Sequence, residues 1–127
     1  MLLNPDSLKP IYMQIAEWLE LEILRGSIAS DEKIYSQYQL AEMFNINPAT
    51  AAKGLSMLVE ENLLYKKRGL GMFVAPQAKE RIRTKRINES LQQLVLEVVA
   101  EAGRLHVPRE ELVRMIEMAE QSFAEGE

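Results

Sequence analysis

The sequence contains no cysteine among its 127 residues. This absence excludes disulfide bridges, thiolate metal ligands and cysteine nucleophiles, and nothing indicates an oxidising compartment. The N-terminus lacks a basic leader with an apolar run, and no uncharged apolar stretch reaches the roughly 20 residues that span a bilayer. We therefore expect a soluble, cytoplasmic protein without a membrane partner.

Histidine is nearly absent, since His106 is the single one in the sequence. A nucleophile needs a nearby base, and the sequence has neither a G-x-S-x-G motif nor a phosphate-binding loop. One histidine cannot supply a multi-histidine metal site either. We predict a protein that is not an enzyme, without metal or cofactor, and we interpret the carboxylate pairs Asp31-Glu32 and Glu60-Glu61 as hydrated surface groups.

The composition predicts a folded chain. Hydrophobic residues make up 47% and charged residues 27% of the sequence, which is typical of globular proteins and not of disordered ones. A chain of 127 residues has room for one modest hydrophobic core and an appended element. We therefore expect one compact domain with an extension.

Charge is unevenly distributed around a net value of −4. The segment 77–87 has four more basic than acidic residues, whereas residues 88–127 have six more acidic than basic ones. A negative whole-chain charge argues mildly against a nucleic-acid partner, because phosphate contacts need local positive potential. The neutral middle of the chain can still present a basic face if its lysines converge with Arg68.

Two helices are predicted in the first 45 residues. Apolar residues recur at helical spacing over residues 10–25, and Gly26 suits the position just past a helix end. Ser36 followed three residues later by Gln39 has the form of a capping box. This pattern predicts a second, short helix that stops near Asn45.

The stretch INPATAAKGL predicts a third helix directly after the second. Asn47 can accept a hydrogen bond from an early helical N–H, and Pro48 presets the backbone at the first helical position. Gly54 would let another helix come close to the inward face, which consists of Ala51, Leu55, Leu58 and Val59. Two short helices joined by a tight turn form a helix-turn-helix, whose second helix is the one offered to the major groove.

The stretch LLYKKRGLGMFVA predicts a β-hairpin, or wing, with strands Leu63–Lys67 and Met72–Ala75. Alternation along a strand would place Lys66 and Arg68 on one face and Lys67 on the other. Glycine supplies the positive φ that such a turn needs.

The remaining residues are predicted to be helical. A run without proline or glycine predicts one long helix over residues 78–102, and a final helix should start at Pro108. The basic residues of segment 79–86 are interpreted either as a hydrated helix start or as auxiliary phosphate contacts. The predicted fold class is mainly α with a small β-hairpin: a winged helix-turn-helix domain at residues 1–76 and a helical region at residues 77–127.

The segment from Pro10 to Ala75 resembles the winged helix-turn-helix domain of GntR-family bacterial transcription regulators. Four blocks match that domain in order: PIYMQIAEWL, YSQYQLAEMF, INPATAAKGLSMLVEENLL and KKRGLGMFVA. The short two-helix tail is similar to that of the small YtrA-like branch. This likeness implies a homodimer in which residues 77–127 form the dimerisation region, with interface residues expected at Leu91, Leu94, Val95, Val98, Leu112, Met115 and Ile116.

The resemblance implies a regulator, most simply a repressor, that binds an inverted-repeat operator in double-stranded DNA. The residues expected to contact DNA lie at two helix starts and in the hairpin: Ser36, Gln37, Tyr38, Asn47, Ala49, Thr50, Lys53, Lys66, Arg68, Gly69 and Gly71. Small side chains at Ala49 and Thr50 would let the backbone approach the groove floor and would offer methyl groups to thymine. The operator sequence, any small-molecule effector and the sign of regulation stay open.

The sequence departs from the family pattern where arginines are usual. The second-helix block usually reads Pro-Ser-Glu-Arg, whereas this chain has Tyr35-Ser36-Gln37-Tyr38. Fewer arginines mean fewer bidentate contacts to guanine, and binding would then depend more on the wing and on DNA shape. Together with the net acidity, this favours one alternative, a winged helix used as a protein-interaction module.

Overall fold

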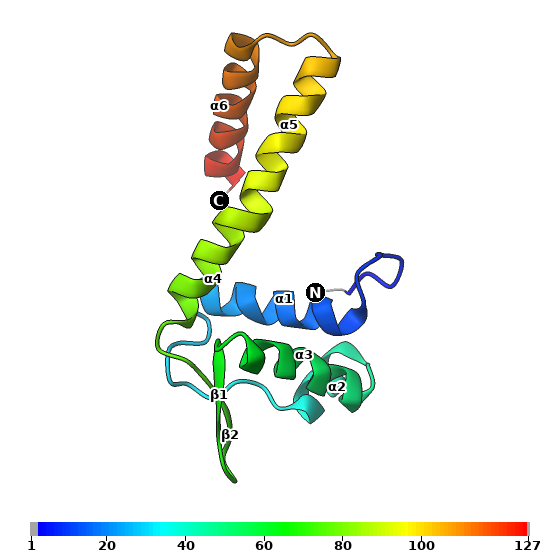
Figure 1. Ribbon diagram of the computed structural model, residues 1–127, viewed down its shortest axis with the longest axis vertical. Helices are drawn as coiled ribbons and strands as arrows, with labels where there is room; N and C mark the ends of the chain where they lie inside the picture. Colours follow the sequence, from blue (N-terminus) through cyan, green and yellow to red (C-terminus); the bar gives the residue numbers. More distant parts are fainter. Residues whose placement is uncertain (1–2, 127) are drawn as a thin grey trace. The chain divides into compact units, whose positions relative to one another are not determined.

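The first half of the chain forms three helices and a hairpin, and the second half is helical (Figure 1). The structure is a computed structural model that describes residues 3–126. Contacts divide the chain into two units, one that ends at Lys85 and one that begins at Arg86. The predicted division at residue 76, between a DNA-binding domain and a dimerisation region, stays a prediction. The first unit defined by contacts extends beyond residue 76 and includes most of the helix that follows the hairpin.

Helix α1 spans Ile11–Leu24 and supplies one wall of the core through the buried side chains of Ile15, Leu19 and Ile23. Their spacing of four residues places them on one face. Pro10 is the N-cap of α1, one position before the first helical residue. The helix ends as expected, because Gly26 adopts a φ of +80°, a conformation that costs glycine little.

Helix α2, Gln37–Phe44, begins with the predicted capping box. The Gln39 backbone N–H donates to Ser36 Oγ at 3.1 Å, and the Ser36 N–H donates to Gln39 Oε1 at 2.8 Å. Asn45 ends the helix in the left-handed conformation, at φ 54°, which asparagine tolerates better than most residues. The turn that follows is short, because α3 begins at Pro48.

Helix α3, Pro48–Glu60, packs between α1 and α2. Its buried face consists of Ala51, Gly54, Leu55 and Leu58. A Cβ placed on Gly54 would lie 2.8 Å from the backbone oxygen of Tyr12 and 3.3 Å from Ile15 Cγ2. The prediction that glycine lets a second helix approach is confirmed, and that helix is α1.

Three aromatic rings make a contact between α1, α2 and the segment before α2. The Trp18 ring lies 5.0 Å from the Phe44 ring in an edge-to-face arrangement and 5.8 Å from the Tyr35 ring. Such arrangements are favourable for aromatic pairs. The single tryptophan therefore joins α1, α2 and the segment before α2.

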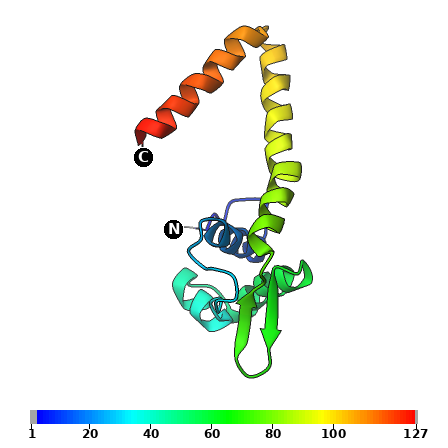
Figure 2. The same cartoon turned by 90° about the vertical axis from the view of Figure 1, so that its left-hand side faces the viewer.

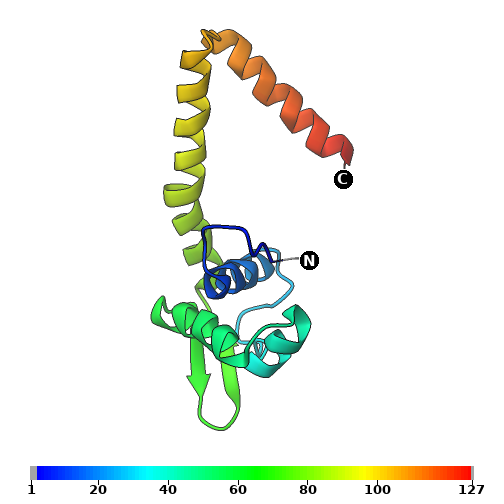
Figure 3. The same ribbon diagram turned by 90° about the vertical axis from the view of Figure 1, so that its right-hand side faces the viewer.

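The hairpin consists of strands β1, Leu64–Lys67, and β2, Gly71–Val74, paired antiparallel (Figure 2). It extends away from α1 on the side of the unit that holds α2 and α3 (Figure 3). Leu64 pairs with Val74, and both side chains are buried in the core. The hairpin is thus anchored at its base and exposed toward its tip.

A third extended segment, residues 31–34, pairs with the free side of β2 and was not predicted from the sequence. Lys33 forms a bridge with Phe73, the Ile34 N–H donates to the Met72 carbonyl at 2.9 Å, and the Val74 N–H donates to the Glu32 carbonyl at 2.9 Å. These bonds cover the edge of β2 that would otherwise be unpaired.

The predicted long helix is divided into α4, Ala78–Arg86, a π-helical turn η1, Ile87–Leu91, and α5, Gln92–Arg104. Ala78 and Ile82 bury one face of α4 in the core of the first unit. Within the second unit, α6 spans Arg109–Gly126 and diverges from α5 after the turn (Figures 2 and 3). Across residues 3–126, no helix combines the length and apolar character that a bilayer crossing requires.

Candidate nucleic-acid interface

The N-terminus of α3 lies at the surface of the first unit. Asn47 Oδ1 accepts the Ala49 backbone N–H at 2.8 Å, so the predicted cap is confirmed. Asn47 and Ala49 are exposed, and Thr50 is half-buried. A helix N-terminus carries a partial positive charge, which favours a phosphate or a groove edge. The first N–H groups of α3 are already engaged, because those of Ala49, Thr50 and Ala51 donate to Asn47. Small side chains around this end leave it accessible.

The cap restricts what Asn47 can recognise. Its side-chain oxygen already accepts one hydrogen bond from Ala49 N, so the Nδ2 donor is the group with its full hydrogen-bonding capacity left. A donor at this position fits acceptors on base edges, such as N7 or O6 of guanine or O4 of thymine, better than it fits base amino groups.

Two of the residues predicted to contact DNA, Lys53 and Tyr38, differ in their surroundings. Lys53 is exposed, and its ammonium lies 4.1 Å from the centre of the Tyr12 ring, a cation–π contact with α1. Tyr38, at the start of α2, is 69% exposed. Ser36 and Gln37 are half-buried, and the Ser36 hydroxyl accepts the capping bond. Of the three predicted contact residues here, Ser36, Gln37 and Tyr38, only Tyr38 is exposed.

Arg68 lies in the turn that follows β1, as the predicted strand end at Lys67 requires. Strand alternation does not extend to a turn residue, so the predicted sharing of a face by Lys66 and Arg68 stays a prediction. Gly69 and Gly71 have φ values of +77° and +115°, so the backbone of the turn needs both glycines. Lys66 and Arg68 are both exposed.

Two further lysines belong to the wing surface. The Lys67 ammonium lies 4.6 Å from the Phe73 ring centre. The side chain of Lys33 crosses the wing, because its Cε lies 2.9 Å from where a Cβ on Gly71 would be. The sequence gives no signal for this role of Lys33, because a bridge outside a regular strand leaves no periodic pattern.

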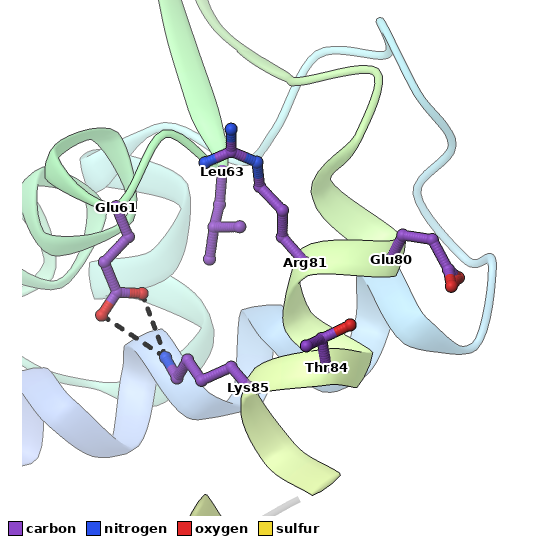
Figure 4. A pocket seen from close by; sticks show the side chains of 6 residues that line it. All are labelled: Glu61, Leu63, Glu80, Arg81, Thr84 and Lys85. Atoms are coloured by element: carbon purple, nitrogen blue, oxygen red, sulfur yellow. Dashed lines mark hydrogen bonds and ion pairs between the residues drawn. The ribbon is translucent and has the colours of Figure 1, made fainter. Parts of the chain in front are cut away.

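Lys85 is bound by two carboxylates. Its Nζ lies 3.0 Å from Glu61 Oε2 (Figure 4). It also lies 2.6 Å from Glu20 Oε2, and Glu20 is only 3% exposed. Burial opposes the charged ammonium, but hydrogen bonds to Glu20 and Glu61 outweigh it and raise the pKa of Lys85. Asp31 is engaged too, since Tyr65 Oη donates to its Oδ1 at 2.7 Å and thereby raises the Tyr65 pKa. All four residues of the acidic pairs are exposed, as the sequence interpretation expected, and Glu61 and Asp31 also have side-chain partners that it did not predict.

An open groove of about 560 Å³ lies beside this ion cluster. It is lined by Glu61, Leu63, Glu80, Arg81, Thr84 and Lys85 (Figure 4). The ammonium of Lys85 is already shared by two carboxylates, so Lys85 itself offers a further ligand in the groove little free positive charge.

The second unit exposes much of its apolar surface. Six of the seven residues predicted to form a dimer interface are between 45% and 56% exposed, and these are Leu91, Leu94, Val95, Val98, Met115 and Ile116. Leu112 is half-buried and lines an apolar hollow of about 310 Å³ between the end of α5 and the start of α6. Exposed apolar area of this kind marks a surface that another chain can cover.

Comparison with known proteins gives the same assignment over most of the first unit. The sequence model described as "Bacterial regulatory proteins, gntR family" matches residues 11–74. The HTH-type transcriptional repressor NagR of Bacillus subtilis (strain 168) is 41% identical over 73 residues, which are 58% of this chain and 30% of NagR. This chain therefore spans less than a third of that relative. The HTH-type transcriptional repressor YtrA of the same strain is 30% identical over 98 residues, 75% of each chain.

Solved structures are similar over both parts of the chain. A GntR family transcriptional regulator from Listeria monocytogenes matches with a TM-score of 0.73 and 28% identity, over 89% of this chain and 97% of that one. AraR(DBD), solved in complex with operator ORX1, matches with a TM-score of 0.54 and 34% identity, over 59% of this chain and 93% of that one. The expected fold class, a winged helix domain with a helical extension, is confirmed.

Proposed function

Because the chain belongs to the gntR family of bacterial regulatory proteins, we propose that it is a repressor that binds an inverted-repeat operator as a homodimer. The observation that supports this most directly is the exposed, Asn47-capped start of α3 in a unit that also carries a hairpin with exposed basic residues. A DNA-binding regulator of transcription is the function of the family. The operator symmetry, the dimer and the contact residues are our proposals.

The proposed base-reading surface is the first turn of α3. Recognition helices contact base edges with their N-terminal residues. Asn47 would donate through Nδ2 to a base acceptor, and the methyl groups of Ala49 and Thr50 would meet a thymine methyl. This surface carries no arginine, so each half-site would be read mainly through donors, methyl groups and shape.

The proposed phosphate-binding surface is the wing together with Lys53. Lys66 and Arg68 are exposed toward the tip, with Lys33 and Lys67 nearby on the same sheet. Lys53 and Lys67 would exchange their aromatic contacts for phosphate, which costs roughly 0.5–1 kcal/mol at an exposed cation–π pair. The hairpin tip would lie along a minor groove or its flanking phosphates.

The proposed dimer would use the apolar surfaces of α5 and α6. A single copy leaves these surfaces exposed, and an isologous contact would bury the same residues on both copies. Two recognition helices would then enter successive major grooves about 34 Å apart. The operator should therefore contain half-sites about one helical turn apart, or a multiple of it.

Selection of duplexes from a random pool tests the proposal. We expect enrichment of an inverted repeat, with affinity that falls as salt rises. A protein-interaction module, which the net charge of −4 favours, would enrich no sequence and would show no salt-dependent retention on heparin. That outcome would overturn the proposed function.

The phosphate contacts can be counted with single variants. Lys53→Ala and Arg68→Ala should each reduce the slope of log affinity against log salt by about one unit per lost contact. Arg104→Ala is the matched control, because it removes a positive charge from α5, where Arg104 pairs with Glu101. A slope equal to that of the control would remove the tested residue from the contact surface.

A further inference from the structure

An apolar side chain stands at the tip of the hairpin. Leu70 is 60% exposed and lies in the turn that joins β1 to β2 (Figure 2). Its backbone N–H donates to the Lys67 carbonyl at 2.9 Å, and this bond closes the turn. A single exposed leucine is common on protein surfaces and by itself indicates no function. The surroundings of Leu70 distinguish it from an ordinary surface residue.

The two neighbours of Leu70 make the tip of the hairpin narrow. Both are glycines, Gly69 and Gly71, and their φ values of +77° and +115° are ones that glycine adopts without strain. Leu70 itself has a negative φ, so the turn does not restrict which residue stands there. The leucine side chain is therefore the one that projects between two residues without side chains.

Basic groups surround this leucine. Lys33 Nζ lies 3.6 Å from where a Cβ on Gly71 would be, which places a positive charge close to the tip. The hairpin contains no acidic residue, and the exposed basic residues before the tip are Lys66, Lys67 and Arg68. A polyanion is the partner that this charge fits. A narrow apolar tip within a basic surface matches the minor groove of duplex DNA, which is about 6 Å wide and negative in potential.

The floor of the minor groove differs between base pairs by one group. Every base pair presents acceptors there, and a G·C pair adds the N2 amino group of guanine, a donor. A leucine side chain has no acceptor for that donor, so a leucine lying against it would leave an amino group buried and unpaired. An apolar side chain in this groove therefore favours A·T pairs.

We propose that Leu70 contributes to operator specificity: it lies against the floor of the minor groove and makes the protein prefer A·T to G·C where the hairpin meets the operator. The inference rests on the proposed function, because it requires an operator that the protein binds. It assigns sequence reading to the hairpin as well as to the first turn of α3.

The test moves the minor-groove amino group without changing the major groove. Diaminopurine·T adds this group to an A·T pair, and inosine·C removes it from a G·C pair. These pairs are introduced one position at a time along the operator selected from the random pool, and affinity is measured by titration. For wild-type protein, diaminopurine at the hairpin position should weaken binding about tenfold relative to adenine. Inosine in place of guanine at that position should strengthen binding by about the same factor.

Three variants assign this response to the side chain at the tip. Leu70→Ala keeps the turn, because residue 70 is exposed and has a negative φ, and it should lose the response to the amino group. Leu70→Met keeps a long apolar side chain and should retain the response. Leu8→Ala is the matched control, since Leu8 is a fully exposed leucine of the same unit and should behave as wild type. Melting temperatures near that of wild type would show that all three fold.

The outcomes separate the two proposals. A Leu70→Ala protein with the wild-type response would assign the preference to Arg68 or to groove shape, and would overturn the inference. A wild-type protein that binds its operator without any response to the amino group would overturn the inference and leave the repressor proposal intact. Loss of the response in Leu8→Ala as well would show that it does not depend on the tip, which also overturns the inference. A wild-type protein that selects no operator would overturn the proposed function itself.

Discussion

Asn47 combines a structural role with a proposed recognition role in one side chain. Its oxygen caps α3 through Ala49 N, and its nitrogen is left to donate outward. Substitutions that preserve one role and change the other can therefore separate helix stability from DNA affinity.

Asn47→Ala should lower the free energy of unfolding by about 1 kcal/mol, because the cap is lost. Asn47→Asp keeps a capping oxygen, so its stability should stay within about 0.5 kcal/mol of wild type, while operator affinity falls because the new charge repels phosphate. Urea unfolding and a binding titration check the two effects. If Asn47→Asp bound the operator as tightly as wild type, α3 would not approach DNA with this end.

Lys85 predicts a definite dependence of stability on pH. Its pKa is raised above the ordinary lysine value of 10.5, so the folded state favours the charged form. The resulting stabilisation is complete below pH 10.5 and is lost as the pH rises through the folded-state pKa. The stability difference between wild type and Lys85→Met, measured by urea unfolding from about pH 8 to about pH 11.5, should be constant at first and then shrink. A difference that grew with pH would contradict this contact.

At the scale of helices and strands, the local signals in the sequence were sufficient for most boundaries. Capping groups at Ser36 and Asn47 and the left-handed ends at Asn45 and Gly26 depend on neighbouring residues only, so the pattern predicts them correctly. The predicted hairpin differs from the observed strands by one residue at each of three ends.

Features that depend on distant residues could not be predicted in this way. The bridge of Lys33 to Phe73 joins segments 40 residues apart, and the link from Lys85 to Glu20 spans 65. The π-helical turn at Ile87–Leu91 also escaped prediction, because its residues fit an α-helical pattern equally well. Local propensity says little about which charged groups meet in the folded chain.

Because α1 and α3 approach closely at Gly54, substitution of Gly54 should affect stability more than substitution of Gly103. Gly54→Ala should destabilise the protein by about 1–3 kcal/mol, because the new Cβ would lie 2.8 Å from the Tyr12 backbone oxygen and the helices must move apart. In Gly103→Ala, on α5, the added Cβ would have no atom within 4 Å. This substitution should therefore leave the free energy of unfolding unchanged or raise it by up to about 1 kcal/mol. Thermal unfolding compares the two variants, and equal effects would contradict the packing described for Gly54.

At the scale of the whole molecule, the two units differ in what they bury. The first unit has a continuous core, whereas every apolar residue from Leu91 to Val99 is at least 45% exposed. A protein with this much uncovered apolar surface is expected to associate. The candidate DNA-binding residues and the candidate dimer residues thus lie on separate units.

Val98→Glu should separate the proposed dimer into monomers, because a charge buried at the proposed interface would lack a partner. Operator affinity should fall by roughly 100-fold or more, since each half-site would then be bound alone. Gln93→Glu is the control, a charge added to an exposed polar position on the same helix. Sedimentation velocity measures the oligomeric state, and a Val98→Glu protein that stayed dimeric would place the interface elsewhere.

Trp18 gives the first unit a tryptophan fluorescence signal that the second unit lacks. This is the single tryptophan of the chain, and it packs against Tyr35 and Phe44 within the first unit. Its fluorescence should report the melting of that unit alone, while far-ultraviolet circular dichroism reports the helices of both. Coincident curves would mean that the two units unfold as one cooperative body, and separated curves would give each unit its own stability without any label.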